Sequence, residues 1–129
     1  MKMKNFTLLT VAFIAFASFR FQSGIEDVIS ALKSGNSSSL SRHFDNYIDV
    51  TLPDKSSNYS KSQAEQIIKD FFGNTGVRNF EVKHKGDNDN KGQFCIGTLH
   101  TKNGNYRTTV YMRMKGDKQV IQEIRFQSL

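Results

Sequence analysis

The spacing of apolar residues changes along the chain, and it predicts helices first and strands afterwards. From residue 25 the apolar positions recur at intervals of three and four residues, which is typical of one buried helix face. These positions are Ile25, Val28, Ile29 and Leu32. Ser23 and Glu26 have the spacing of a capping box before this stretch, and Gly35 follows it as a helix terminator. The pattern therefore predicts a helix between these signals.

Two more helices are predicted before the main run of strands. A short one follows the serine-rich stretch SGNSSSLS and carries Leu40 and Phe44, four residues apart, with His43 as a half-exposed surface group. A longer one begins at Ser60, where Gln63 completes a second capping pattern, and ends at Gly73. Its predicted buried face consists of Ala64, Ile67, Ile68 and Phe71.

Alternation of apolar and polar residues predicts the strands. One strand lies between the second and third helices, where Ile48, Val50 and Leu52 alternate with polar residues. Four more segments follow residue 76: Phe80–Lys85, Gln93–Thr101, Tyr106–Lys115 and Gln119–Gln127. The short connections between them favour antiparallel pairing. Helices grouped early and strands grouped late predict an α+β domain, with N-terminal helices packed on one face of a mainly antiparallel sheet.

The first strand raises a chemical question, because carboxylates and a phenol alternate along it. These residues are Asp45, Tyr47 and Asp49. Alternation turns them away from Ile48 and Val50, toward solvent or the rim of the sheet. An exposed carboxylate is a poor base at neutral pH unless burial or a like charge raises its proton affinity. We therefore expect this stretch to be structural and nominate no catalytic residue.

The turns decide which strand residues face the helices, because a slip of one residue turns every side chain over. A three-residue loop ending at Gly104, with this glycine in a left-handed bulge, pairs His100 with Tyr106 and collects the apolar residues on one face. A three-residue loop at the next turn pairs Val110 with Ile124. This register gathers a candidate pocket at one end of the core face: Thr98, His100, Tyr106 and Thr108.

The opposite face of the predicted sheet is rich in cations. Its candidate basic residues are Lys83, Arg107, Arg113 and Arg125. Glu81 and Glu123 lie among them, and such a mixture usually marks a solvated sheet face. Polyanion binding through this face is the alternative.

Residues 1–22 have the composition of an export signal. Lys2 and Lys4 precede an uncharged, mostly apolar run, and Ala17 offers a small residue to a signal peptidase. The run is shorter than the roughly 20 residues that a membrane anchor needs. We expect cleavage between residues 17 and 22, export to the periplasm or the medium, no membrane anchor after cleavage, and a single domain over residues 23–129.

Composition narrows the chemistry further. Cleavage after Ala17 would leave 112 residues (129 less 17), with the net charge lowered from +6 to +4 by loss of two lysines. Cys95 is the only cysteine, so the chain forms no intramolecular disulfide, and its apolar neighbours favour a packed strand residue over a nucleophile. The three histidines lack the spacing of metal ligands, and there is no glycine-rich phosphate loop. We expect no metal, no cofactor and no specific nucleic-acid partner.

Four stretches resemble a known family. They are IDVTLPDKSSNYSKSQAEQIIKDFF from Ile48, FEVKHKG from Phe80, IGTLHTKNGNYR from Ile96 and IQEIRF from Ile121. With the order of elements, they resemble the exported Bacteroidetes proteins of domain of unknown function 4783, within the nuclear transport factor 2-like (cystatin-like) superfamily. The resemblance implies a curved sheet that forms a cone around the helices. It implies no reaction, because no activity is assigned to that family.

The superfamily gives the candidate pocket a meaning, since the region around His100 and Tyr106 can line a cavity in the cone. Ketosteroid-isomerase-like members carry a basic carboxylate just before a proline on the first strand, and an oxyanion tyrosine on the first helix. Here Leu52 precedes Pro53, and the first helix has no tyrosine. Both departures disfavour that chemistry.

Three functions stay open from the sequence. The favoured one is a non-catalytic exported module that binds a small molecule or a protein, with a homodimer also open. The second is an enzyme that uses the His100–Tyr106 end of a pocket, against which stands a simple hydrogen bond between these residues at the rim of the core. The third is polyanion binding. A filled core with an exposed apolar or aromatic sheet surface would favour a protein partner.

The export signal yields a direct prediction. Intact-mass spectrometry of the protein recovered from its native host should place the N-terminus near residues 18–23, because the peptidase removes the apolar segment. Recovery of the chain with Met1 intact, or its retention in the cytoplasm, would contradict export.

Overall fold

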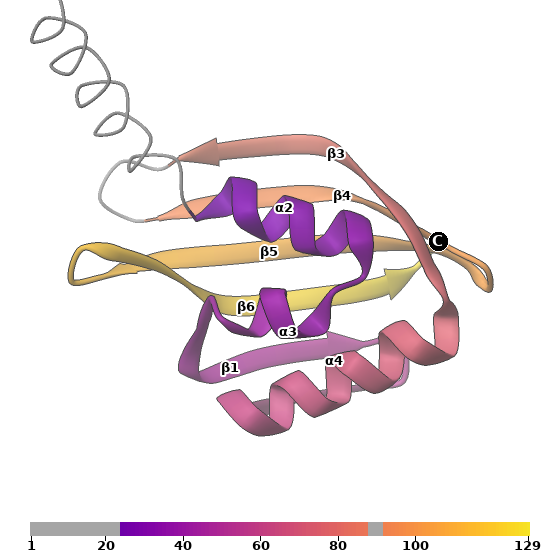
Figure 1. The fold of residues 1–129 in the computed structure, drawn as a ribbon, viewed down its shortest axis with the longest axis horizontal. Helices are drawn as coiled ribbons and strands as arrows, with labels where there is room; N and C mark the ends of the chain where they lie inside the picture. Colours follow the sequence, from indigo (N-terminus) through magenta and orange to yellow (C-terminus); the bar gives the residue numbers. More distant parts are fainter. Residues whose placement is uncertain (1–23, 88–91) are drawn as a thin grey trace, which may run out of the picture.

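The computed structural model describes residues 24–87 and 92–129, and in this part three helices lie on one face of a single sheet (Figure 1). The helices are α2 (Ile25–Ser34), α3 (Ser37–Ser41) and α4 (Lys61–Thr75). The strands are β1 (Phe44–Leu52), β2 (Lys55–Ser60), β3 (Val77–Asp87), β4 (Gln93–Thr101), β5 (Gly104–Lys115) and β6 (Lys118–Ser128). The predicted export signal, residues 1–22, lies outside the described residues.

The sheet has six strands in the order β2-β1-β6-β5-β4-β3. β1 runs parallel to β6, and every other neighbouring pair is antiparallel. Helix α4 carries the chain from β2 at one edge to β3 at the other, so two strands consecutive in sequence form opposite edges. The predicted α+β architecture, with helices on one face of a curved and mainly antiparallel sheet, is confirmed.

Helix α2 buries the predicted face and ends at Gly35, whose φ of 64° is left-handed. Its N-cap residue is Gly24, which has no side-chain cap, and Ser23, the residue predicted to start the capping box, lies outside the described residues. Gln93 on β4 supplies the missing acceptor instead, because its Oε1 accepts a hydrogen bond from the Ile25 N–H at 3.0 Å. A contact distant in sequence thus replaces the local cap.

Helix α4 begins as predicted and ends later. Ser60 and Gln63 form a complete capping box. The helix passes through Gly73, where nothing lies within 4 Å of an added Cβ, and stops at Gly76 with φ 73°. The Gly76 N–H donates to the Phe72 carbonyl at 2.9 Å, which closes the last turn. The predicted residue Phe71 is only partly buried, whereas Phe72 enters the core.

The start of the sheet contains a strand that periodicity does not reveal. The sequence of β2, KSSNYS, is polar and mostly exposed, so no apolar alternation predicts it. It forms because the chain turns back at Pro53-Asp54 and pairs with β1 from Leu52 opposite Lys55. Phe44, predicted on the short helix, is instead the first residue of β1.

The predicted pairing of His100 with Tyr106 is wrong. The loop between β4 and β5 has two residues rather than three, so Tyr106 pairs with Leu99 and His100 with Asn105. Gly104 has a positive φ of 120°, as predicted. The register of β4 is therefore shifted by one residue, and each side chain of this strand lies on the face opposite to the predicted one.

Close packing against β3 explains why β4 takes this register. The helix-facing residues of β4 are Cys95, Gly97, Leu99 and Thr101, all of them buried. A Cβ at Gly97 would lie 2.7 Å from Cζ of Phe80, so only glycine leaves room for this buried ring. The larger apolar residues Phe94 and Ile96 point to the opposite face. The apolar pattern of the sequence had predicted that these two large residues face the helices.

In the hairpin between β5 and β6 the paired residues are the predicted ones, although the loop is shorter than predicted. Val110 pairs with Ile124, and Thr108 with Phe126. The loop has two residues, since Lys115 pairs with Lys118, and a bulge between Tyr111 and Met112 restores the predicted register further along. The partners are confirmed and the three-residue loop is wrong.

Candidate functional site

The sheet face opposite the helices carries rows of side chains from neighbouring strands, and no described helix covers it. We call it the open face. One row contains Gly86, Phe94, Tyr111, Glu123 and Asp49. The next contains His84, Ile96, Thr109, Arg125 and Thr51. A third contains Glu81, Thr98, Arg107 and Gln127.

The middle of the open face is apolar and aromatic. Phe94 and Ile96 are partly exposed, and Tyr111 is 40% exposed. The Phe94 ring lies over Gly86, where a Cβ would stand 2.6 Å from the ring. The glycine on the edge strand therefore leaves the space that this aromatic ring occupies.

Two open grooves flank this apolar centre. The Tyr111 groove has a volume of about 460 Å³. Its lining includes Asp49, Phe94, Tyr111, Glu123 and Arg125. The Arg107 groove has a volume of about 580 Å³. Its lining includes Lys83, His84, Ile96, Thr98, Arg107 and Thr109.

The candidate basic residues do share the open face, but most of them are paired with carboxylates. Lys83 contacts Glu81 at 3.1 Å, Arg125 contacts Glu123 at 2.7 Å, and Arg113 contacts Asp45 at 2.7 Å. Arg107 has no ion-pair partner among the described residues. The face is therefore mixed in charge, and its one basic focus is at Arg107. Simple alternation from Lys83 would place Lys85 on this face as well. It contacts Glu26 of α2 on the helix side instead, because a bulge between Val82 and His84 interrupts the alternation of β3.

The four residues of the candidate pocket do not come together. Thr98 and His100 lie on the open face, whereas Tyr106 and Thr108 lie on the helix side. His100 Nδ1 is 3.2 Å from Asn105 Oδ1, and its Nε2 is 3.4 Å from a carboxylate oxygen of the surface residue Glu81.

The helix side of the sheet is packed where the cone cavity was expected. Thr108 is fully buried, and its hydroxyl donates to the Tyr106 carbonyl at 3.4 Å. The Tyr106 ring meets the Phe71 ring edge-on, with 5.1 Å between their centroids. The Phe126 ring lies on Phe71 as well, with 4.9 Å between the centroids of these two rings. Aromatic side chains thus occupy the space next to the predicted ligand-binding residues.

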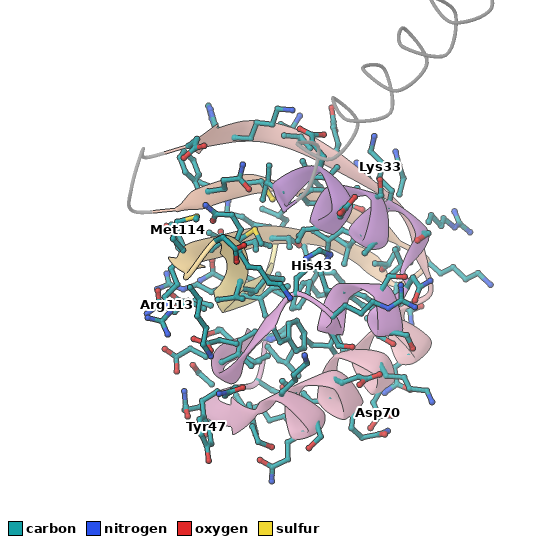
Figure 2. All side chains as sticks on the ribbon, turned by 60° about the vertical axis from the view of Figure 1, so that its left-hand side comes forward. Lys33, His43, Tyr47, Asp70, Arg113 and Met114 are labelled. Atoms are coloured by element: carbon teal, nitrogen blue, oxygen red, sulfur yellow. The ribbon has the colours of Figure 1, made fainter. Side chains whose placement is uncertain are left out.

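Asp45 departs from its predicted exposure. Its side chain points to the open face, as alternation requires, but it is only 10% exposed. The carboxylate accepts hydrogen bonds from Lys115 Nζ at 2.8 Å and from Arg113 Nη2 at 2.7 Å. The hydrogen bonds from Lys115 and Arg113 hold the pKa of the Asp45 carboxyl well below its usual range. Figure 2 shows Arg113 beside Met114 at one margin of the molecule, across from the helix residues Lys33 and Asp70.

Tyr47 and Asp49 are exposed, as predicted. Asp49 accepts a hydrogen bond from Asn58 Nδ2 of β2 at 2.8 Å, so it helps to hold the edge strand. Both carboxylates of β1 therefore have structural roles. Asp45 forms a buried ion-pair cluster, and Asp49 forms a hydrogen bond at the surface.

A smaller groove lies between α2 and α3. Its volume is about 370 Å³, and its polar lining includes Asp27, Ser30, Arg42 and His43. Burial lowers the pKa of His43, so the ring is neutral at physiological pH. His43 is partly exposed, as predicted, and its backbone carbonyl accepts the Ile121 N–H at 2.6 Å. This hydrogen bond to β6 fixes the position of the His43 backbone.

Cys95 is fully buried, which confirms the predicted packing role. Burial raises the pKa of the thiol to about 12, so it remains protonated. Since the thiolate is the nucleophile, this cysteine is chemically inert in the folded protein.

Within residues 24–87 and 92–129, no three His, Cys, Asp or Glu side chains are grouped to hold a metal ion. In the same part of the chain, no helix is long and apolar enough to cross a membrane. The side chains that do gather on one accessible surface are those of the open face. This surface offers aromatic and aliphatic side chains, hydroxyl groups and the guanidinium of Arg107, which has no carboxylate partner among the described residues. Such groups suit the noncovalent binding of another molecule.

These features define a class of protein. Helices on one face of a curved sheet are shared with a crystal structure of a nuclear transport factor 2-like protein of unknown function from Cytophaga hutchinsonii, with a TM-score of 0.58 over 81% of this chain and 86% of that one. The two sequences are 8% identical, so this likeness shows the fold alone.

Within this class the family is specific. The family model "Domain of unknown function (DUF4783)" matches residues 25–127, and the chain belongs to that family. A DUF4783 protein from Bacteroides uniformis is 36% identical, with a TM-score of 0.80 over 83% of this chain and 98% of that one. One from Bacteroides fragilis is 31% identical, with a TM-score of 0.76 over 84% of this chain and 100% of that one. No curated protein matches the chain.

The Asp45 cluster predicts a pH-dependent stability. Asp45→Asn should lower the free energy of unfolding at pH 7 by about 1–3 kcal/mol, because two half-exposed cations lose a covered partner. The folded pKa is depressed, so the contribution is present above the unfolded value of about 4 and is lost as the pH falls below it. The difference from wild type in urea denaturation should therefore shrink in acid.

Asp49→Asn is the matched control, since Asp49 is exposed and makes one surface hydrogen bond. It should change the free energy of unfolding by less than about 0.5 kcal/mol at any pH. Equal effects of the two substitutions, or an Asp45→Asn effect that does not change with pH, would contradict the assigned role of Asp45.

Proposed function

We propose that this chain is an exported, non-catalytic module that binds a protein partner on its open face. The observation that carries the proposal is the partly exposed apolar centre of a helix-free sheet face, formed by Phe94, Ile96 and Tyr111. Protein interfaces are enriched in aromatic residues and arginine, with polar groups around an apolar centre. Glu123, Arg125 and the other charges of the open face form such a rim.

A protein fits this surface better than a small molecule. Small-molecule sites enclose most of the ligand, often in a concave apolar cavity. On the helix side the residues facing the core, including Leu99, Val110 and Phe126, are fully buried against one another. The two grooves of the open face are open along the sheet, and together they cover several strands. An extended contact uses such a surface more fully.

The enzyme alternative loses its geometric basis. Tyr106 packs against Phe71 on the helix side, whereas His100 lies within 3.4 Å of Glu81 on the open face. The pairing of His100 with Asn105 and of Leu99 with Tyr106 keeps the two side chains on opposite faces of the sheet. They therefore cannot act together on one bound substrate.

The polyanion alternative is weakened by the carboxylates of the same face. Glu81, Glu123 and Asp45 each neutralise a cation there. A polyanion would meet repulsion from Asp49 and Glu123 in the Tyr111 groove. Export is part of the proposal and rests on the composition of residues 1–22.

Site-specific photocrosslinking tests the proposal. The photoreactive residue p-benzoylphenylalanine replaces Tyr111, whose exposed ring lies in the apolar centre, and the protein is irradiated in its native host. A discrete adduct with a protein is expected, because the ring of Tyr111 would lie inside the interface. An adduct of twice the mass of the chain would identify the partner as a second copy.

Lys69 on α4 is the matched control, because it is exposed on the helix side. The same photoreactive residue at this position should give no such adduct. Absence of an adduct from position 111, or equal adducts from both positions, would overturn binding on the open face.

A further inference from the structure

The two grooves of the open face differ in charge. The Tyr111 groove contains the carboxylates of Asp49 and Glu123, and its cation Arg125 is bound to Glu123. No Asp or Glu is among the described residues that line the Arg107 groove, and the terminal carboxylate of Leu129, which also lines it, forms no ion pair. Two cations, Lys83 and Arg107, line it instead. Acidic side chains therefore outnumber basic ones in the lining of the Tyr111 groove, whereas the lining of the Arg107 groove contains basic side chains and no acidic ones.

Arg107 is set apart from the other cations of this surface. Arg113 and Lys115 bind Asp45, Arg125 binds Glu123, and Lys83 binds Glu81. Among the described residues, Arg107 forms neither an ion pair nor a side-chain hydrogen bond. Its five N–H donors are available to a bound group.

The surroundings of Arg107 narrow the chemistry of that group. Across the strands it pairs with Thr98 and Gln127, which offer hydroxyl and amide groups. Ile96 lines the same groove and is partly exposed, so an apolar surface lies beside the cation. A guanidinium binds carboxylates in a two-pronged geometry, and neighbouring apolar surface favours an aliphatic body attached to the acid.

We infer that the Arg107 groove binds a carboxylate side chain of the protein partner, together with an aliphatic side chain next to it. This inference rests on the proposed function and names the chemistry of the partner at one half of the same face. The occupant is an acidic segment of a protein. A single unpaired cation on an apolar groove suits one carboxylate, whereas a polyphosphate or nucleic acid needs a row of cations.

Substitution of Arg107 tests the inference through the partner. In the protein that carries the photoreactive residue at position 111, Arg107→Gln should reduce adduct yield about tenfold or more, since a charge-assisted hydrogen bond is lost. Arg107→Lys keeps the charge without the fork and should reduce it less. Arg42→Gln is the matched control, because Arg42 is exposed on the helix side, away from the open face, and it should change the yield by less than about twofold.

A fragment titration tests the groove without the partner. The probe is 4-methylpentanoate, which has one carboxylate and an aliphatic body, and 4-methylpentanamide is its uncharged control. The Nε–H resonance of Arg107 should shift saturably with the acid but not with the amide, and the shift should weaken as salt is added. The Arg125 resonance should stay in place.

The outcomes separate the two proposals. An adduct that forms in the parent protein and is unchanged by Arg107→Gln overturns the carboxylate inference and leaves the proposed function standing. No adduct at all overturns the proposed function, and the titration then decides on the groove alone. No acid-specific shift of Arg107, or equal shifts of Arg107 and Arg125, overturns the inference. Circular dichroism of each variant checks that the fold is kept.

Discussion

The register of β4 is the constraint on which the rest of the structure depends. Gly97 must face the helices, because the ring of Phe80 occupies the space that any larger side chain would need. Alternation then sends Cys95 and Leu99 into the core and leaves Phe94 and Ile96 on the open face. The apolar centre of that face is thus a consequence of packing on the other side of the same strand.

Much of the fold follows from local patterns, and the failures have a common origin. The Ser60 cap, the central strands and the α+β layers depend on short-range spacing, and they are confirmed. The start of α2 depends on Gln93, a distant residue, and β2 forms through its partner β1 rather than through its own polar sequence. Contacts between distant segments carry no periodic signal in the sequence.

The site was harder to predict than the fold. Apolar size favoured the core for Phe94 and Ile96, although an interacting surface also needs apolar residues. Because the actual register of β4 differs by one residue, the four residues of the candidate pocket lie on two opposite faces of the sheet. The candidate basic residues were placed on the correct face. Their ion pairs with carboxylates could not be predicted from the sequence, since Asp45 and Arg113, for example, are 68 positions apart in the chain. The small residue Gly97 was the available signal, because a glycine within a strand often marks close approach of a neighbour.

Thiol reactivity of two adjacent positions tests the outward placement of Ile96 most directly. In wild type, Cys95 should resist a maleimide reagent until the protein unfolds, because it is fully buried and protonated. In a Cys95→Ser background, Ile96→Cys should react rapidly in the folded state, since position 96 lies in the open Arg107 groove. Rapid reaction of Cys95 together with protection of Ile96→Cys would contradict the register, and with it the open face as the binding surface.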